Sequence, residues 1–389
     1  MSQKGREVVI AAAVRTPIGR GHPEKGIYKD SHPSHLLATV YSEVIARAGI
    51  DPTEVGDVIA GCVSQFGEQG FNIGRNAWLE AGLPITTPAT TIDRQCGSAQ
   101  QAVNFASSLI ASGIHDVVIG GGVEHMGHLP LGGQRKTEEL FGEAMTPELF
   151  ERYEIAGQGI GAELIAEEYE VSRAECDELG LISQQRGAKA AAEGAFEREI
   201  VPIAVNGDTY TADQGIRPQT TLEGLAELKP AFKPDGRHTA GNSSQVSDGA
   251  AAVLLMSREK AEELGVEPRA CIVDHTTVGC DPVKMLEGPI PATTAILERN
   301  SMRLDDIDRI EVNEAFAAVV AAWRREHSPD MDKVNVRGGA IALGHPLGSS
   351  GARLITTLLH ALEDEDQERG FVTMCCGGGL GTATLIERV

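Results

Sequence analysis

Apolar runs of strand length alternate with helical patterns along the first part of the chain. β-branched runs occupy Val8 to Val14, Val58 to Cys62 and Val117 to Gly121, and helical patterns run from about Ser34 to Ala48 and again after Cys96. Such alternation is typical of βαβ units on a largely parallel sheet. The chain is therefore expected to belong to the α/β class.

The same alternation returns from about Ala292 onward. A helical pattern lies near Thr293 to Arg299, a strand is expected at Ile310 to Val312, a further helix after Gly348, and a strand at Phe371 to Met374. The second region thus repeats the order of elements of the first.

The two regions also match in register. Asp57-Val58-Ile59 aligns with Asp308-Arg309-Ile310, and Gly97-Ser98 aligns with Gly348-Ser349, with the same interval between the two anchors in each copy. Each copy then continues through a helix into an apolar strand that ends in glycines. We interpret this as an internal duplication; two unrelated α/β segments that match by chance are the alternative.

A segment of different character separates the copies. It is richer in polar loops and charged helical patterns, and it interrupts the repeat. The expected organisation is an N-terminal half at 1–122 and 245–270, an inserted loop domain at 123–244, and a C-terminal half at 271–389. An insertion of this kind is where a substrate-covering element is expected, although a purely structural insertion would also fit.

The net charge of the chain limits the kinds of partner that it can bind. The 389 residues carry a formal net charge of −22, which repels nucleic acid and anionic membrane surfaces. So acidic a chain also suits a halophilic source, because salt screens self-repulsion. The start of the chain is unlike a signal peptide, the apolar runs are too short to span a bilayer, and the last residues differ from a peroxisomal address, so a cytoplasmic enzyme is expected.

Seven cysteines without metal-ligand spacing predict free thiols and no metal site. Cys96 stands between a β-rich run and the start of a helix, beside Gly97. The N-terminus of a helix lowers the pKa of a thiol and makes it a better nucleophile. A buried structural cysteine is the alternative for Cys96 taken alone.

Three further stretches carry candidate chemistry at equivalent places of the repeat. His345 lies in a glycine-rich loop that corresponds to the loop of Cys96, so the duplication is expected to bring the two side chains to neighbouring strand ends. Asn313 directly follows a strand and can hold a water or donate to an oxyanion. Cys375 ends the last strand, where a single thiol can act as acid or base, and Gly377 follows with an exposed backbone N–H group.

These stretches, in this order, closely resemble the motifs of the thiolase family. The four motifs are Cys96-Gly97-Ser98, Asn313-Glu314-Ala315-Phe316, Gly344-His345-Pro346-Leu347-Gly348-Ser349-Ser350-Gly351 and Cys375-Cys376-Gly377-Gly378-Gly379. The likeness runs from Val8 to Glu387. It implies the thiolase fold, in which two duplicated βαβαβ-type halves form five αβαβα layers and a loop domain covers the coenzyme A (CoA) site.

The resemblance also implies a role for each residue. Cys96 would be the nucleophile, and His345 would activate it and form an oxyanion hole with a water held by Asn313. Cys375 would be the second acid/base. The N–H groups of Cys96 and Gly377 would form the other oxyanion hole.

The same resemblance implies contacts to CoA, which is expected as co-substrate without a permanently bound cofactor. Ser244 would contact the pantetheine arm, Arg217 would contact the nucleotide, and Phe316 would also belong to the substrate- or CoA-binding residues. The alternatives are that Ser244 only caps a helix and that Arg217 is only a surface arginine. One departure stands at Gly157-Gln158-Gly159, where many members carry His-Met-Gly. It puts the acyl-chain preference in doubt.

The expected reaction is reversible, CoA-dependent thiolytic cleavage of 3-ketoacyl-CoA. Two stretches, Gly121 to His128 and Asn242 to Gly249, look more like degradative members; a biosynthetic acetoacetyl-CoA thiolase is the alternative. A ketoacyl synthase or hydroxymethylglutaryl-CoA synthase would lack Cys375, and a catalytically silent scaffold would not need all four chemical residues. A homodimer, or a tetramer made of two dimers, is expected.

Overall fold

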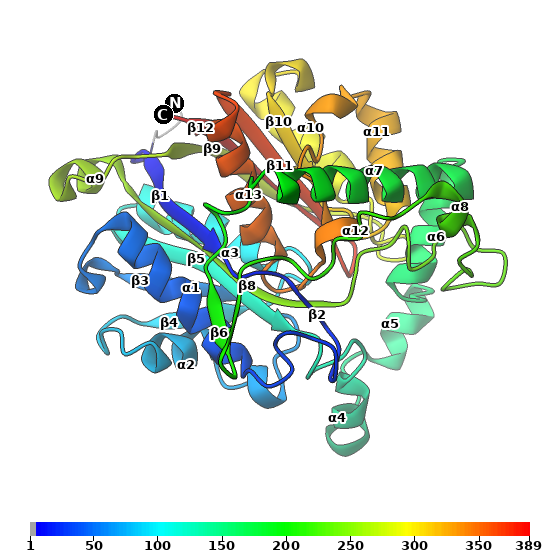
Figure 1. Cartoon of the computed structure of the whole chain (residues 1–389), viewed down its shortest axis with the longest axis horizontal. Coiled ribbons are helices and arrows are strands. Elements are labelled where there is room, and N and C mark those ends of the chain that lie inside the picture. Colours follow the sequence, from blue (N-terminus) through cyan, green and yellow to red (C-terminus); the bar gives the residue numbers. More distant parts are fainter. Residues whose placement is uncertain (1–4) are drawn as a thin grey trace.

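A computed structural model describes residues 5–389, with the backbone alone at residues 134 and 135 (Figure 1). Residues 1–4, which open the expected N-terminal half, lie outside the described residues. The first copy of the repeat contains β1 (Val8–Arg15), β2 (Gly19–Arg20), α1 (Pro33–Ala48), β3 (Asp57–Gly61), α2 (Ile73–Glu80), β4 (Ala89–Ile92), α3 (Ser98–Ala111) and β5 (Val117–His125).

The second copy and the strands that lead into it follow later in the chain. They are β8 (Ser247–Ser257), α9 (Arg258–Leu264), β9 (Ala270–Gly279), α10 (Pro289–Asn300), β10 (Arg309–Val312), α11 (Ala317–His327), α12 (Ala340–Leu343), α13 (Ser350–Asp364), β11 (Arg369–Cys376) and β12 (Leu380–Arg388). Between the copies lie α4 (Gln134–Phe141), α5 (Pro147–Arg152), α6 (Gln158–Glu168), α7 (Arg173–Ala192), β6 (Ile203–Val205), β7 (Asp208–Tyr210) and α8 (Leu222–Ala226).

The main sheet has the strand order β10-β11-β12-β9-β1-β8-β5-β3-β4, with β2 beside β8. Among the strands of residues 5–389, only the pairs β3–β4, β3–β5 and β10–β11 are parallel, so the prediction of a largely parallel sheet is wrong. The reason lies in the connections. For example, β11 and β12 are joined by the short turn at Gly377–Gly379, which permits only an antiparallel pair.

The predicted duplication is visible in the strand pairing. In the first copy Gly61 of β3 pairs with Gly122 of β5, and in the second copy Val312 of β10 pairs with Thr373 of β11. Gly61 and Gly122 are separated by as many residues as Val312 and Thr373, so the two strand pairs have the same register. Both copies then add an antiparallel strand, β8 beside β5 and β12 beside β11.

Five layers result from the way helices cover this sheet. α3 packs against β3, β5 and β8 of the first copy and also against β9 and β12, while α13 packs against β10 and β11 and also against β1 and β8. These two helices therefore form a middle layer between the two parts of the sheet. α1 and α2 cover the outer face of the first part, and α10 with α11 covers that of the second (Figure 1).

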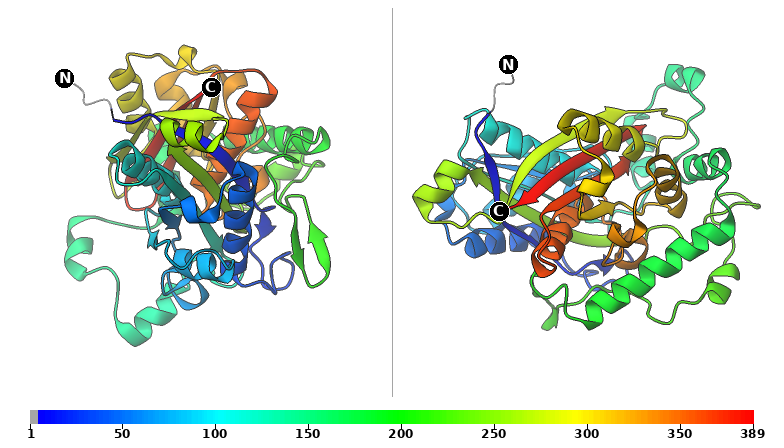
Figure 2. Two further views of the ribbon diagram at one scale, coloured as in Figure 1. Left: turned by 90° about the vertical axis from the view of Figure 1, so that its left-hand side faces the viewer. Right: turned by 90° about the horizontal axis from the view of Figure 1, so that it is seen from above.

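The segment that carries α4 and α5 projects away from this body (Figure 2). Several of its large apolar side chains are exposed, among them Leu140 at 76% and Phe141 at 85%. None of the helices within residues 5–389 combines the length and the apolar character that a membrane crossing requires.

The acidic run Glu363-Asp364-Glu365-Asp366, at the end of α13, is ion-paired and not merely solvated. Its carboxylates contact the guanidinium groups of Arg198, Arg269, Arg309, Arg337 and Arg388. Part of the negative charge read from the sequence is thus offset locally by arginines that come from distant segments.

Candidate active site

Cys96 lies at the N-terminus of α3 and is 1% exposed. The preceding residue, Gln95, has a positive φ of 50°, which turns the chain sharply into the helix. Ser98 stabilises this turn, because its hydroxyl accepts from the N–H of Arg94 at 2.8 Å and donates to the carbonyl of Gln95 at 2.6 Å. The predicted junction of β-rich segment and helix is therefore confirmed, and it presents the thiol at the helix end.

The end of β11 brings Cys375 and Gly377 to the same place. The backbone N–H groups of Gly377 and of Cys96 itself lie near enough to the sulfur of Cys96 to lower its pKa. Cys375 is fully buried and lies close enough for a thiolate on Cys96 to raise the pKa of Cys375, after the larger effect of burial. Two thiols from opposite halves of the chain thus share one interior site.

The predicted lowering of the Cys96 pKa is wrong. Burial raises the pKa of Cys96 to about 12, and the two N–H groups that face its sulfur offset only part of that effect. The helix end alone therefore does not produce a thiolate at neutral pH. A base that takes the proton as the thiol attacks is required instead.

His345 is buried in the loop before α13, and its hydrogen bonds define its tautomer. The hydroxyl of Ser350 donates to the carbonyl of Pro346 at 2.8 Å, so its oxygen accepts from Nδ1 of His345 at 2.6 Å. The proton is therefore on Nδ1, and Nε2 carries the basic lone pair. Burial, followed by the charge of Arg353, lowers the pKa of His345 to about 3, so the imidazole is neutral.

Asn313 directly follows β10 and faces His345. Its Nδ2 lies 3.4 Å from Nε2 of His345, and its backbone N–H donates to the carbonyl of Thr373 at 3.0 Å. Within the chain that the structure describes, the buried Oδ1 of Asn313 has no hydrogen-bond partner. An amide oxygen without a partner, beside a basic nitrogen, suits a bound water or a substrate group.

A carboxylate that was not predicted from the sequence holds two loops of the site together. Glu124, at the end of β5, accepts from the N–H groups of Val63 and Gly348 at 2.9 Å each and of Ser64 at 3.0 Å, and from the amide of Gln69 at 2.8 Å. Gly348 belongs to the loop of His345, in the other half of the chain. The available signal was a carboxylate placed directly after a buried strand.

A second missed carboxylate supports Asn313. Glu314 accepts from the hydroxyl of Ser183 at 2.6 Å, from Asn335 at 3.0 Å and from the N–H of Ile341 at 3.1 Å. It therefore joins α7 and α12 to the strand end that carries Asn313.

Arg217 and Ser244, the predicted CoA contacts, line one cavity of about 650 Å³. Arg20 lines it as well, and its charge contributes, after burial, to a lowered pKa of Arg217. Two guanidinium groups at one cavity suit an anion with several phosphates. Arg20 was not predicted, because nothing in its local sequence marks it.

The segment that carries Ser244 is attached to the Asn313 motif. The N–H of Ser244 donates to the carbonyl of Ala315 at 2.9 Å, and Ser243 forms an isolated bridge with Phe316. Phe316 itself packs edge-on against the rings of Phe232 and His238. The structure therefore connects Ser244, which lines the cavity, to the segment Ala315-Phe316 that follows Asn313.

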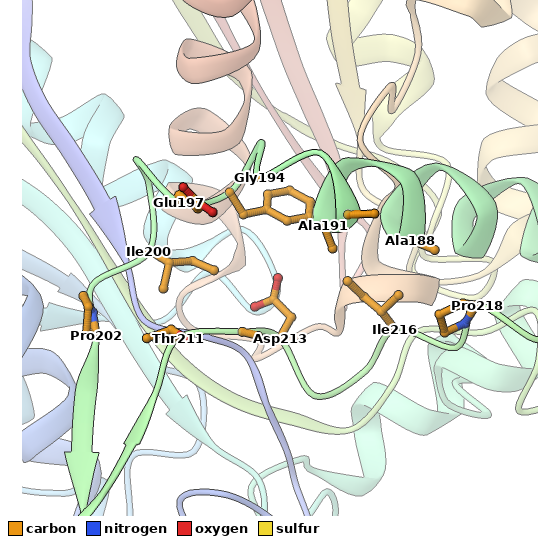
Figure 3. A pocket seen from close by; sticks show the side chains of 13 residues that line it. Ala188, Ala191, Gly194, Glu197, Ile200, Pro202, Thr211, Asp213, Ile216 and Pro218 are labelled. Carbon is orange, nitrogen blue, oxygen red and sulfur yellow. The ribbon is translucent and has the colours of Figure 1, made fainter.

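A different cavity, of about 750 Å³, contains none of the predicted site residues. It lies below the end of α7, and Ala191, Ile200 and Ile216 give it a mainly apolar wall (Figure 3). The carboxylate of Asp213 also lines it and pairs with Arg15. No group of three or more His, Cys, Asp or Glu side chains within residues 5–389 is arranged to hold a metal ion.

Taken together, the geometry defines a class. A buried thiol at a helix end, a second thiol, a neutral imidazole whose Nε2 is unprotonated and two inward N–H groups suit acyl transfer through a thioester. The fold on which they lie is a duplicated, five-layered α/β arrangement.

Comparisons with known proteins agree with that class. The family model "Thiolase, N-terminal domain" matches residues 8–259, and "Thiolase, C-terminal domain" matches residues 266–388. The chain belongs to the thiolase family, and the predicted fold class is confirmed.

Individual relatives match along nearly their whole length. A steroid 3-ketoacyl-CoA thiolase of Mycobacterium tuberculosis is 44% identical over 98% of this chain and 94% of its own. A 3-ketoacyl-CoA thiolase of Idiomarina loihiensis is 42% identical over 99% of this chain and 100% of its own. The crystal structure of an acetyl-CoA acetyltransferase of Bacillus anthracis matches with a TM-score of 0.90 and 39% identity, covering 100% of both chains.

Proposed function

We propose that this protein catalyses the reversible, CoA-dependent thiolytic cleavage of 3-ketoacyl-CoA to acetyl-CoA and a shortened acyl-CoA. The observation that carries the proposal is the meeting of Cys96, Cys375 and the N–H of Gly377 at one buried point, drawn from both halves of the chain. Coenzyme A is the co-substrate, and the acyl group passes through a thioester on Cys96.

In the first step the thiol of Cys96 attacks the 3-keto carbon of the substrate. Its proton moves to Nε2 of His345, the nitrogen that the Ser350 hydrogen bond leaves basic. The negative charge that develops on the former keto oxygen is stabilised by the N–H groups of Cys96 and Gly377. Because the resting thiol and imidazole are both neutral, proton transfer and attack occur together.

In the second step the bond between C2 and C3 breaks. The electron pair forms the enolate of acetyl-CoA, and the thiol of Cys375 protonates its carbon. The enolate oxygen is stabilised by His345 together with a water held by Asn313. The raised pKa of Cys375 keeps this thiol protonated until the carbanion forms.

In the third step free CoA attacks the acyl group on Cys96. The thiolate of Cys375 accepts the proton of the CoA thiol, and the N–H groups of Cys96 and Gly377 again stabilise the oxyanion. As the shortened acyl-CoA leaves, His345 returns its proton to the sulfur of Cys96. Every residue then has its starting protonation state.

We propose that residues 123–244 form the loop domain that covers the CoA site, between halves at 1–122 with 245–270 and at 271–389. Arg217 and Arg20 would bind the phosphates, and Ser244 would contact the pantetheine arm. The cavity is lined from both sides, by Arg20 of the first half and by Arg217 of the inserted segment, which supports this arrangement.

The degradative direction is favoured, because two of the relatives named above are 3-ketoacyl-CoA thiolases. Condensation of two acetyl-CoA molecules is the second candidate, and an acetyl-CoA acetyltransferase of Chromobacterium violaceum that is 43% identical supports it. Gln158, the central residue of the Gly157-Gln158-Gly159 departure, lies with Gln95 beside Gly377. Two polar side chains at this point would bear on which acyl chains fit.

We further propose a cytoplasmic homodimer or dimer-of-dimers tetramer from a halophilic source. The edge strand β4, the almost fully exposed Phe71 nearby and the projecting α4–α5 segment offer surface for self-association. The net charge of −22 supports salt adaptation. Sedimentation in molar KCl tests the assembly, and a melting temperature that is the same in low and molar KCl would contradict the salt adaptation.

The function is tested by thiolysis assays with 3-ketoacyl-CoAs of several chain lengths, in molar salt. We expect CoA-dependent release of acetyl-CoA from substrates longer than acetoacetyl-CoA. Activity confined to acetoacetyl-CoA would favour the biosynthetic alternative. The absence of any activity in correctly folded protein would contradict the proposal.

A further inference from the structure

The interior between α13 and β10 holds titratable side chains that the proposed chemistry does not use. Arg353, near the start of α13, has a side chain that is 1% exposed, and within residues 5–389 none of its three guanidinium nitrogens has a hydrogen-bond partner. The carboxylate Oε2 of Glu311 on β10 lies 3.8 Å from Nη1 of Arg353. That oxygen also lacks a partner in the described part of the chain.

A third unsatisfied group faces the same side of α13. The hydroxyl of Thr357, one turn after Arg353, donates to Oε1 of Glu199 at 3.1 Å, and the same oxygen accepts from Nε of Arg15 at 2.6 Å. The other oxygen, Oε2, is buried without a partner among the described residues. The charge of Glu199 acts on both Arg353 and Glu311, so the three side chains share one interior region.

Direct contacts do not satisfy these groups. A guanidinium has five N–H donors, and a separation of 3.8 Å is too long for a hydrogen bond. Buried charges without hydrogen bonds are strongly destabilising. Buried polar sites of this kind are ordinarily filled by ordered water, which makes about three hydrogen bonds and bridges gaps beyond the reach of a direct bond.

We propose that Arg353, Glu311 and Glu199 hold a cluster of internal water molecules, and that this hydrated cluster positions His345 and Asn313 against each other. The cluster lies behind the active site and contacts no substrate. Its members are therefore positioning residues.

The placement of the cluster explains how it would act. Ser350, which fixes the ring of His345, precedes Arg353 by one turn on α13, and Glu311 precedes Asn313 by two positions at the end of β10. The water-bridged pair thus sets the spacing of the two elements that carry the site. At 3.4 Å, the contact between Asn313 and His345 is sensitive to that spacing.

Charge adds a second, electrostatic connection. After burial, the positive charge of Arg353 contributes to the lowered pKa of His345. The other charged groups that act on the cluster come from other elements, namely Arg15, Glu314 and Arg337. Arg15 is itself held by Asp213, whose carboxylate lines the cavity of Figure 3.

The first test does not depend on activity. A high-resolution crystal structure of the wild-type protein is expected to show ordered waters within hydrogen-bond distance of the Arg353 guanidinium, of Glu311 Oε2 and of Glu199 Oε2. A direct, two-bond contact between Arg353 and Glu311, with no water at these atoms, would overturn the proposal.

The second test is kinetic and rests on the proposed thiolase function. Arg353→Met is expected to lower kcat about tenfold or more and to change KM for the acyl-CoA less than about twofold, because it disturbs the site without touching the CoA cavity. The acid limb of the kcat profile should move to higher pH, because His345 loses a neighbouring positive charge. Arg353→Lys keeps the positive charge, so the acid limb of its kcat profile should stay at the wild-type pH. Its kcat should fall less than that of Arg353→Met.

Glu311→Gln keeps the volume and covers the case in which Arg353→Met does not fold; its kcat should fall several-fold at unchanged KM. Thr356→Val, at a buried hydroxyl of α13 that bonds Ala352 instead of the cluster, is the matched control and should keep the wild-type kcat and pH profile. Folded variants at both positions with wild-type kcat and pH profile would overturn the proposal. A wild-type protein without thiolytic activity would instead contradict the proposed function, and the crystallographic test would still decide the cluster.

Discussion

The two copies of the repeat place different side chains at equivalent points. Asn313 follows β10 where Cys62 follows β3, and Cys375 stands on β11 where Glu124 stands on β5. In each pair we assign chemistry to the residue of the second copy, while the residue of the first copy is structural. The comparison indicates that duplication produced equivalent strand ends and that later divergence gave their side chains different roles, chemical in one copy and structural in the other.

The residues of each pair also reach across to the other copy. Glu124 of the first copy binds the N–H of Gly348 in the second, and Cys375 of the second copy lies beside Cys96 of the first. Neither copy therefore forms a complete site by itself. Four experiments, in order of decreasing effect, test this division between chemical and structural positions.

Replacement of the nucleophile should have the largest effect. Cys96→Ser is expected to lower kcat by roughly four orders of magnitude or more, because no other side chain forms the thioester. Cys62→Ala, at the other buried cysteine of the first copy, should keep most of its turnover. Steady-state thiolysis measures both, and equal losses in the two variants would break the comparison.

The pH dependence of alkylation tests the neutral state of the Cys96–His345 pair. Because burial raises the pKa of Cys96 to about 12, the thiolate fraction grows with pH across the neutral range. The rate of inactivation by iodoacetamide should therefore rise about tenfold per pH unit between about pH 6 and 9. A rate that is constant over this range would indicate a thiolate–imidazolium pair and contradict the neutral assignment; Cys96→Ser gives the background labelling.

The second thiol should matter next. Cys375→Ala is expected to lower turnover by roughly 10²- to 10⁴-fold, the range for loss of a general acid or base, and to leave acylated Cys96 detectable by mass spectrometry of the intact protein. The adjacent Cys376→Ala is the control, because this buried sulfur packs against Gly97 at the start of α3 and has no part in the proposed proton transfer. Undiminished turnover in Cys375→Ala would remove its assigned role.

The smallest effect is expected at Glu124, which occupies in the first copy the position of Cys375 in the second. Glu124→Gln keeps the size but turns an NH₂ group toward backbone donors, which should cost about 1–3 kcal/mol of unfolding free energy. Thermal unfolding should show a lower Tm, together with a reduced kcat. Glu68→Gln, at an exposed carboxylate near the same loop, should leave both nearly unchanged, and a wild-type Tm for Glu124→Gln would show that the two loops are held together by other contacts.

The sequence alone predicted the duplication and the four chemical stretches, because glycine-rich turns and strand ends leave a local signal. It did not predict the antiparallel strands that complete each copy, since β8 and β12 are buried on both sides and lack a distinctive period. The predicted direction of the pKa shift of Cys96 was wrong for a related reason. The effect of a helix end can be read locally, whereas burial depends on segments that arrive from the far end of the chain.

The carboxylates show the same limit. Glu124, Glu314 and Glu311 are acidic residues at strand ends, and nothing in their neighbourhood distinguishes them from surface charges. Their partners are backbone N–H groups or side chains brought close only by folding.

The helix layer shared by both parts of the sheet also bears on how the chain can be divided. α3 and α13 each bury one side against strands of the opposite copy, so a fragment ending near Gly265 would expose that side to water. Two separately produced fragments should consequently aggregate or remain unfolded until they are mixed. A gene split at this point would yield an obligate pair, because the middle helix layer is complete only when both pieces are present.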